Sequence, residues 1–265
     1  MARLNAVSHL QRDPVSEHLV IRRIGMHDLM DALKQGTADF WAAPTHIFFI
    51  CLMYPVLGVF FAGLAFGNNM LPLLFPLMSG FALIGPLAAV GLYEISRERE
   101  RGQEVSVGSV SNVFRSRSLG SIAALGVLLM VIFIAWLLTA QTLYQSLFGW
   151  RAPESLSAFL GEVFTTRHGW TLIIVGNVLG FVFSAVVFAL SVISFPLLVD
   201  RDVGAIPAIL TSFRAVAANP GPMIVWAFIV AGLLVVGFIP LFIGLAVVLP
   251  ILGHATWHLY RKVVE

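Results

Sequence analysis

The sequence predicts an all-α membrane protein with six transmembrane helices arranged as three hairpins, each preceded by a short amphipathic interfacial helix. Two observations carry this prediction. Of the 265 residues, 58% are hydrophobic and only 11% are charged, whereas soluble domains carry about 25% charged residues. The apolar residues also gather in runs of roughly twenty, the length that crosses about 30 Å of hydrocarbon. Because water cannot solvate such runs, we expect the chain to fold in lipid.

The expected spans follow the apolar runs in chain order. Four lie at 44–66, 71–95, 119–143 and 171–198, and the run 223–260 is long enough for two more. Gly237 and Pro240 lie in the middle of that last run and predict the tight turn between spans five and six. We therefore divide the chain into a polar, partly flexible N-terminal arm (1–23) and a six-helix transmembrane domain (24–265).

Charge predicts the orientation of these spans. Of the 16 lysine and arginine residues, all but Arg151 and Arg167 fall before span one, in the loops after spans two and four, or in the tail. Basic residues of short loops stay on the cytoplasmic side, so both termini are expected in the cytoplasm. Five spans would move Arg261 and Lys262 to the other side, a poorer fit. The lysine and arginine residues form no continuous patch, so nucleic acid is not an expected partner.

Three short segments before spans one, three and five each carry an apolar stripe on one helical face. The stripes are Met26, Leu29, Met30 and Leu33; Val107, Val110 and Phe114; and Ile206, Ile209, Leu210 and Phe213. Such helices can lie in the interface with the apolar face toward the lipid.

The second helix of each hairpin contains a proline toward its cytoplasmic half: Pro86, Pro196 and Pro250. Proline removes a backbone donor and tends to kink a helix. Two interpretations are open. The helices form a threefold repeat of kinked elements around a shared centre, or the match is chance, because proline is common in membrane helices.

Residues that could carry chemistry are few. The candidate functional cluster is Glu94, Arg97, Asp200, Arg201, His254, Trp257 and His258. Arg97 lies one helical turn after Glu94, so we expect these two to pair. His254 and His258 are four residues apart and could hold one metal ion or haem iron, with His46 as a possible third ligand. The alternative is that both histidines bond backbone, water or Glu94.

Other chemistry is not expected. The predicted spans contain no lysine or arginine at mid-membrane depth, and Glu94 is their only acidic residue, which argues against a proton-driven transporter. Motifs for phosphate binding, dinucleotide binding, serine nucleophiles and zinc proteolysis are absent from the sequence. We therefore expect neither an enzyme nor a cofactor. The single cysteine, Cys51, is read as a buried hydrophobe, and the deep Asn177 is expected to bond a neighbouring helix.

Four stretches resemble a known family. They are Gly80-Phe-Ala-Leu-Ile-Gly-Pro-Leu-Ala-Ala-Val-Gly-Leu-Tyr-Glu-Ile-Ser-Arg, Phe195-Pro-Leu-Leu-Val-Asp-Arg-Asp, Ala218-Asn-Pro-Gly-Pro-Met and Leu249-Pro-Ile-Leu-Gly-His-Ala-Thr-Trp-His-Leu-Tyr-Arg. Over residues 24–265 the chain resembles a bacterial family of predicted integral membrane proteins carried as a domain of unknown function. Some members are labelled as candidate cytochrome c oxidase subunits. The resemblance implies a bacterial inner-membrane protein, and too few histidines remain here for a catalytic oxidase subunit.

The sequence thus leaves three functional hypotheses, one of which is the haem or metal protein that would use His254 and His258. The first is a non-catalytic accessory subunit or assembly partner of a membrane complex, such as a respiratory one, with the bilayer, other membrane subunits or a second copy as partners. The alternative is a small-solute transporter or channel, in which proline-kinked helices would line a cavity.

Overall fold

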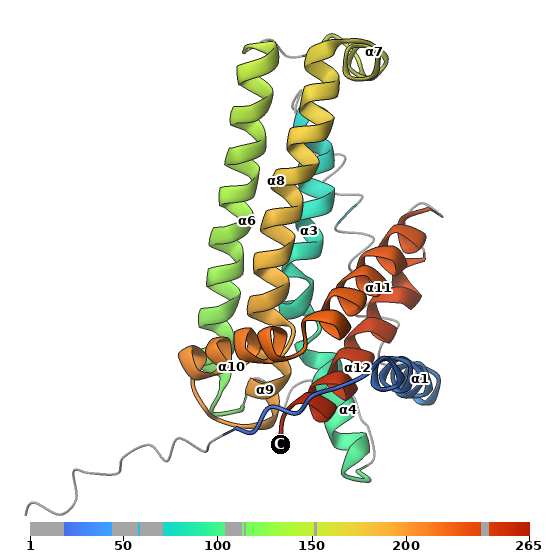
Figure 1. Cartoon of the computed structure of the whole chain (residues 1–265), viewed down its shortest axis with the longest axis vertical. Coiled ribbons are helices and arrows are strands. Elements are labelled where there is room, and N and C mark those ends of the chain that lie inside the picture. Colours follow the sequence, from blue (N-terminus) through green and yellow to red (C-terminus); the bar gives the residue numbers. More distant parts are fainter. Residues whose placement is uncertain are drawn as a thin grey trace, which may run out of the picture.

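The computed structural model describes residues 19–43, 71–103, 115–150, 153–239 and 244–265, together with Gly58 and Val113. The described chain folds into helices, as predicted. They are α1 (Met26–Ala42), the short 3-10 helix η1 (Leu71–Leu73), α3 (Leu74–Ala88), α4 (Val90–Glu100), α6 (Leu119–Phe148), α7 (Leu156–Thr165), α8 (Arg167–Ser191), α9 (Ser194–Asp200), α10 (Ala205–Ala218), α11 (Pro220–Phe238) and α12 (Leu245–Val263) (Figure 1).

Four helical stretches are long and apolar enough to cross a membrane. They are Leu71–Glu100, Leu119–Phe148, Arg167–Asp200 and Pro220–Phe238, and they coincide with predicted spans two to five. Apart from Gly58, predicted span one, with His46 and Cys51, lies outside the described residues. Helix α12 has 19 residues, but its second half carries two histidines and two bases. The structure therefore supports four spans, and the six-span hairpin arrangement stays a prediction.

Helices α3, α6 and α8 stand side by side as an upright bundle, and the α11–α12 hairpin leans away from it (Figure 1). Trp136 of α6 is buried in this bundle and donates a hydrogen bond from its indole to the Pro76 carbonyl at 2.9 Å. Helix α7, which the sequence reasoning missed, lies across the far end. Ser155 precedes the helix, and its hydroxyl caps the N-terminus by accepting from the Ala158 amide.

Spans two and four are each interrupted near their proline. Helix α3 gives way to α4 at Ala89, three residues after Pro86, and α8 gives way to α9 at Val192 and Ile193, just before Pro196. Helix α12 continues through Pro250 without a break. Two of the three prolines thus interrupt their helices. The helices of the three proline segments do meet, because α4, α9 and α12 all contact one another.

Serine side chains bond the backbone around the second interruption. Ser194 donates to the Leu190 carbonyl at 2.6 Å. Ser212 of α10 donates to the Ala189 carbonyl at 2.7 Å and accepts from the Ile193 amide at 3.2 Å. A broken membrane helix needs such partners because unpaired backbone groups are costly away from water.

The two described amphipathic segments form helices at the same end of the bundle (Figure 1). In α10, the predicted apolar residues Ile206, Leu210 and Phe213 point outward, and the buried positions are small: Ala208, Thr211, Ser212 and Ala215. This arrangement leaves the large apolar side chains free to face lipid. The remaining stripe, Val107, Val110 and Phe114 before span three, lies outside the described residues.

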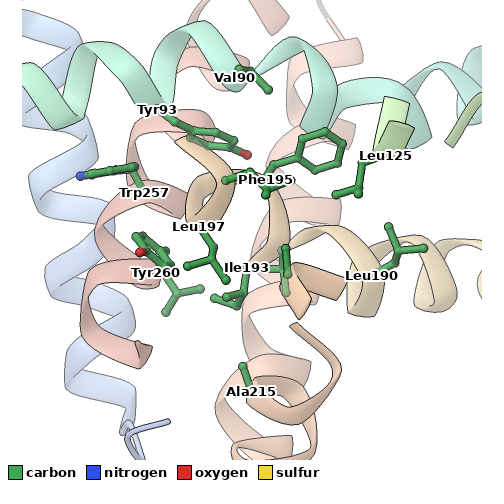
Figure 2. Close-up of a cluster of buried hydrophobic side chains, with 14 of the residues drawn as sticks. Val90, Tyr93, Leu125, Leu190, Ile193, Phe195, Leu197, Ala215, Trp257 and Tyr260 are labelled. Carbon is green, nitrogen blue, oxygen red and sulfur yellow. The ribbon is translucent and has the colours of Figure 1, made fainter. Parts of the chain in front are cut away.

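Both described chain ends meet at this end of the bundle, which we call the charged end. Ile21 forms a β-bridge with Val264, and the Asn219 side chain at the α10–α11 junction bonds the backbone of Arg22 and Ile24. The last residues of the predicted arm are therefore docked. Just inside, a core of large side chains fills the crossing of α4, α9 and α12, among them Tyr93, Phe195, Leu197, Trp257 and Tyr260 (Figure 2).

Candidate functional site

The candidate site begins with the close approach of α1 to α12. A Cβ atom placed on Gly36 would lie 2.4 Å from the backbone nitrogen of Ala255, so the two helix backbones nearly touch there. Leu29, Ala32, Gly36 and Asp39 form the buried face of α1. Their spacing of three and four residues is that of one helical face. This contact directs the Asp39 carboxylate at His254 and His258, which flank Ala255 on α12.

Asp39 is the centre of what we call the Asp39 cluster: Asp39, Ser96, Arg99, His254 and His258. Oδ2 of Asp39 accepts from the Ser96 hydroxyl at 2.6 Å and lies 2.8 Å from Nε2 of His258. Oδ1 accepts from the Arg99 guanidinium at 2.8 Å. Asp39 as a whole residue is only 6% exposed. Helices α1, α4 and α12 are therefore joined through one side chain.

The proton positions follow from this geometry. The Ser96 hydroxyl has one hydrogen and donates it to Asp39, so Nδ1 of His254, 2.6 Å from the same hydroxyl oxygen, must be the donor of that contact. The second ring nitrogen of His254, Nε2, is then a bare acceptor, and it has no hydrogen-bond partner within the described chain. Because a carboxylate only accepts, Nε2 of His258 carries a proton toward Asp39.

The electrostatics of Asp39 favour its charged form. Burial alone would raise the pKa of this carboxyl, but the hydrogen bonds from His258 and Ser96, with the nearby histidines, outweigh it and hold the pKa below its ordinary value. Asp39 thus remains a carboxylate at neutral pH and is neutralised by the adjacent Arg99.

A second group, the Asp200 cluster, consists of Asp200, Glu100, Trp257, Tyr260 and Arg261. Asp200 accepts from the Tyr260 hydroxyl at 2.8 Å and from Arg261 at 3.3 Å. Glu100 accepts from the Trp257 indole at 3.1 Å and from Nε of Arg261 at 3.0 Å. These contacts join α4 and α9 to α12.

The structure brings the sequence-predicted residues to one end of the fold but divides them among these groups. The predicted pair of Glu94 and Arg97 is confirmed, at 2.5 Å, and Arg97 also donates to the Val199 carbonyl on α9. Arg201 lies beside Asp200 and donates to the Glu265 carbonyl at 3.3 Å.

The histidines do not bond Glu94. Their partners are Ser96 and Asp39, which sequence reasoning missed together with Arg99. Asp39 falls on the same face of the predicted interfacial helix as Leu29 and is ten residues further on. An acid at a core-facing position is the signal that could have revealed it. Within the described residues no group of three side chains is arranged to hold a metal ion, so metal binding by His254 and His258 stays a prediction.

A pocket of about 400 Å³ opens beside the Asp39 cluster, between α1, α4 and α12. It is lined by Gln35, Asp39, Ser96, Arg99, Glu100, His258, Arg261 and Lys262. Lys262 pairs with Asp31 at 2.5 Å on its rim. The basic side chains of the pocket, Arg99, Arg261 and Lys262, thus all form ion pairs with acidic residues. The arrangement can hold a polar group or water, and it presents mixed charge rather than one sign.

Comparison with known proteins covers part of this architecture. Residues 74–200, from α3 to the end of α9, match the model of a family described as "Predicted integral membrane protein (DUF2189)". The match includes Ser96 and Arg99 and leaves out Asp39 and both histidines, so it is narrower than the resemblance expected over 24–265. The searches of curated proteins and of solved structures gave no match. With its four long apolar helices, the chain is an integral membrane protein, and over residues 74–200 it is similar to this family.

Proposed function

We propose that the protein is a non-catalytic accessory subunit or assembly partner of a membrane complex, held in the bacterial inner membrane with its charged end in the cytoplasm. One observation carries this proposal. The polar groups of the charged end are used to join helices: the Asp39 cluster links α1, α4 and α12, and the Asp200 cluster links α4, α9 and α12. Such a network makes a rigid platform, which suits a docking role.

The same geometry argues against hydrolysis at the Asp39 cluster. Ser96, His254 and Asp39 form a continuous hydrogen-bonded chain of the residue types used in nucleophilic catalysis. However, Ser96 and His254 are both 0% exposed, and the serine proton goes to the carboxylate rather than to the histidine. In this arrangement His254 cannot accept the serine proton, because that proton goes to Asp39 and Nδ1 of His254 donates its own proton to the same hydroxyl.

The proposal is tested by what migrates with the protein. Native membranes containing the tagged full chain are solubilised in several mild detergents and resolved on native gels, with the purified protein as the size marker. We expect the tagged chain in a band larger than the purified protein, and mass spectrometry of that band identifies its companions. Because some proteins of the resembled family are labelled as oxidase subunits, the band is also stained for oxidase activity. Migration with the purified marker in every detergent would count against the proposal.

The pocket favours one alternative, a small-solute transporter or channel. It lies at the charged end, beside the helices of interrupted span two and of α12, and interrupted helices can line transport pathways. The alternative is tested by reconstituting the purified protein in vesicles and measuring the leak of protons, sodium, potassium and common metabolites. Vesicles as tight as protein-free ones exclude it for those solutes.

A further inference from the structure

The outward face of α8 carries polar side chains at membrane depth. Trp170, Ile174, Asn177, Phe181 and Ser184 are all exposed, and their spacing of four, three, four and three residues places them on one narrow stripe of the helix. We call these five residues the α8 stripe. The opposite side of α8 packs on α6, where a Cβ atom placed on Gly180 would lie 3.2 Å from the Trp136 ring, and α8 stands alongside α6 (Figure 1).

Asn177 lies deep in the membrane. It is ten residues beyond Arg167, the first residue of α8, which at 1.5 Å per residue is about 15 Å along the axis. With Arg167 at the headgroups, that depth is close to the middle of a hydrocarbon layer of about 30 Å.

The described part of the chain gives the Asn177 amide few hydrogen-bond partners. Within the described residues its side chain makes one hydrogen bond, from Nδ2 to the Ile173 carbonyl of the same helix at 2.7 Å. The expected bond to a neighbouring helix is therefore absent from the described part of the chain. An amide has two donor hydrogens and an accepting oxygen, so one hydrogen and the oxygen of Asn177 lack a partner among the described residues. Unpaired polar groups are unfavourable at membrane depth.

We propose that the α8 stripe is a self-association surface and that its occupant is the same stripe of a second copy. Two copies inserted with the same orientation can be related by a twofold axis only if that axis is perpendicular to the membrane. Residues next to the axis then meet their own counterparts at the same depth. Asn177 thus meets Asn177, and each amide donates to the oxygen of the other. A different partner would need its own polar group at that one depth, whereas a second copy always has it.

The rest of the stripe fits this arrangement. Ser184 lies two turns from Asn177 on the same stripe, and its small side chain permits close approach of the backbones. Ile174 and Phe181 flank Asn177 and supply apolar packing on either side. A single asparagine in an apolar seam fixes the register of paired helices. The inference goes beyond the proposed function, because self-association needs no other subunit.

The test uses purified full-length protein in liposomes, with the dimer fraction measured by single-molecule photobleaching over a range of protein-to-lipid ratios. We expect a density-dependent dimer. Asn177→Leu should weaken it about threefold to twentyfold, the range measured for hydrogen bonds between membrane helices, and Asn177→Gln should retain most of it. The matched control is Thr142→Val on α6, an exposed hydroxyl outside the stripe that bonds the Leu138 carbonyl; it should leave dimerisation unchanged.

Cross-linking locates the interface independently. In a Cys51→Ala background, Phe181→Cys should form an intermolecular disulfide on oxidation, and Leu138→Cys, an exposed position on α6, should not. Monomers at every density overturn the proposal, as does a dimer that Asn177→Leu leaves unaffected. A photoreactive group on Phe181→Cys that labels only lipid or the chain's own residues 44–66 also overturns it. Since no other subunit is present, none of these results depends on the complex sought under the proposed function.

Discussion

The contact between α1 and α12 can be tested by adding one methyl group, with Gly36→Ala. The new Cβ would lie 2.4 Å from the nitrogen and 2.7 Å from the Cα of Ala255. Ordinary van der Waals contact begins near 3.4 Å, so the helices must separate by about 1 Å to accept it. Backbone atoms cannot rotate away as a side chain can.

The magnitude follows from two opposing effects. Overpacking a tight contact costs about 1–3 kcal/mol, and replacing glycine by alanine inside a helix returns up to about 1 kcal/mol. We therefore expect Gly36→Ala to lower the free energy of unfolding by about 1–2 kcal/mol. Gly161→Ala in α7 is the matched control, because its new methyl meets nothing within 4 Å; it should be neutral or stabilising.

The assay is reversible unfolding in mixed detergent micelles, followed by tryptophan fluorescence, which the buried Trp257 on α12 makes sensitive to this contact. A second variant sharpens the test. Ala255→Gly removes the Cβ of Ala255 but leaves its backbone in place, so the double variant Gly36→Ala/Ala255→Gly should recover only part of the loss. Full recovery, or a Gly36→Ala protein as stable as the control, would refute the backbone contact.

Three further predictions concern the Asp39 cluster and the topology. Asp39→Asn should lower the free energy of unfolding by about 2 kcal/mol. It removes charge-assisted hydrogen bonds and points an amide hydrogen at a donor on Ser96, Arg99 or His258. An unchanged free energy of unfolding would contradict the network. Because the pKa of Asp39 is lowered on folding, its stabilisation is fully present above the unfolded value of about 3.9 and is lost as the pH falls through the lower folded value. Titrating the free energy of unfolding against pH should therefore show an acid loss that Asp39→Asn reduces, with His254, His258 and Arg99 being the charged or titratable groups that face the carboxylate. Finally, we expect the C-terminus in the cytoplasm. A reporter that is active only in the cytoplasm should therefore work when fused after Glu265, and activity of a reporter that works only in the periplasm would contradict the orientation.

Apolar runs located the spans well because their length is fixed by the bilayer and needs no tertiary information. Predicted spans three and four correspond to helical stretches Leu119–Phe148 and Arg167–Asp200. The first is longer than expected at its C-terminal end, and the second is longer at both ends. The breaks were harder to place. An interruption follows Pro86 and another precedes Pro196, whereas the helix around Pro250 is continuous. Whether a helix breaks near a proline depends on whether neighbouring side chains bond the freed backbone groups. Ser212, which does this at the second break, is 16 residues beyond Pro196 in the sequence.

The site was only partly predictable, because its central residue belongs to a helix far away in the sequence. His254 and His258 were recognised from their spacing, but Asp39 is 215 residues before His254 and reaches it only through the contact at Gly36. The stripe of α10 shows a related limit. Its large apolar residues were visible, but which side faces the protein was decided by Ala208 and Ala215, whose small size permits close packing.

Helix length explains how a chain without deep charges can hold so many ion pairs. The stretch Leu71–Glu100 has 30 residues, about 45 Å of helix, so about 15 Å must project beyond a hydrocarbon layer of about 30 Å. Ten residues make up that excess, and α4, the part after the break, has 11. The 34 residues Arg167–Asp200 make about 51 Å of helix, so about 21 Å projects beyond the same layer. Helix α9, at the end of this stretch, therefore lies outside the hydrocarbon. Both clusters are therefore built on the projecting ends, at headgroup or water depth. There the exposed pair of Arg261 and Glu100 stays hydrated, so it contributes more to the fixed orientation of α4 and α12 than to net stability. Asp39 is buried, and its hydrogen bonds to α4 and α12 offset the desolvation of its charge.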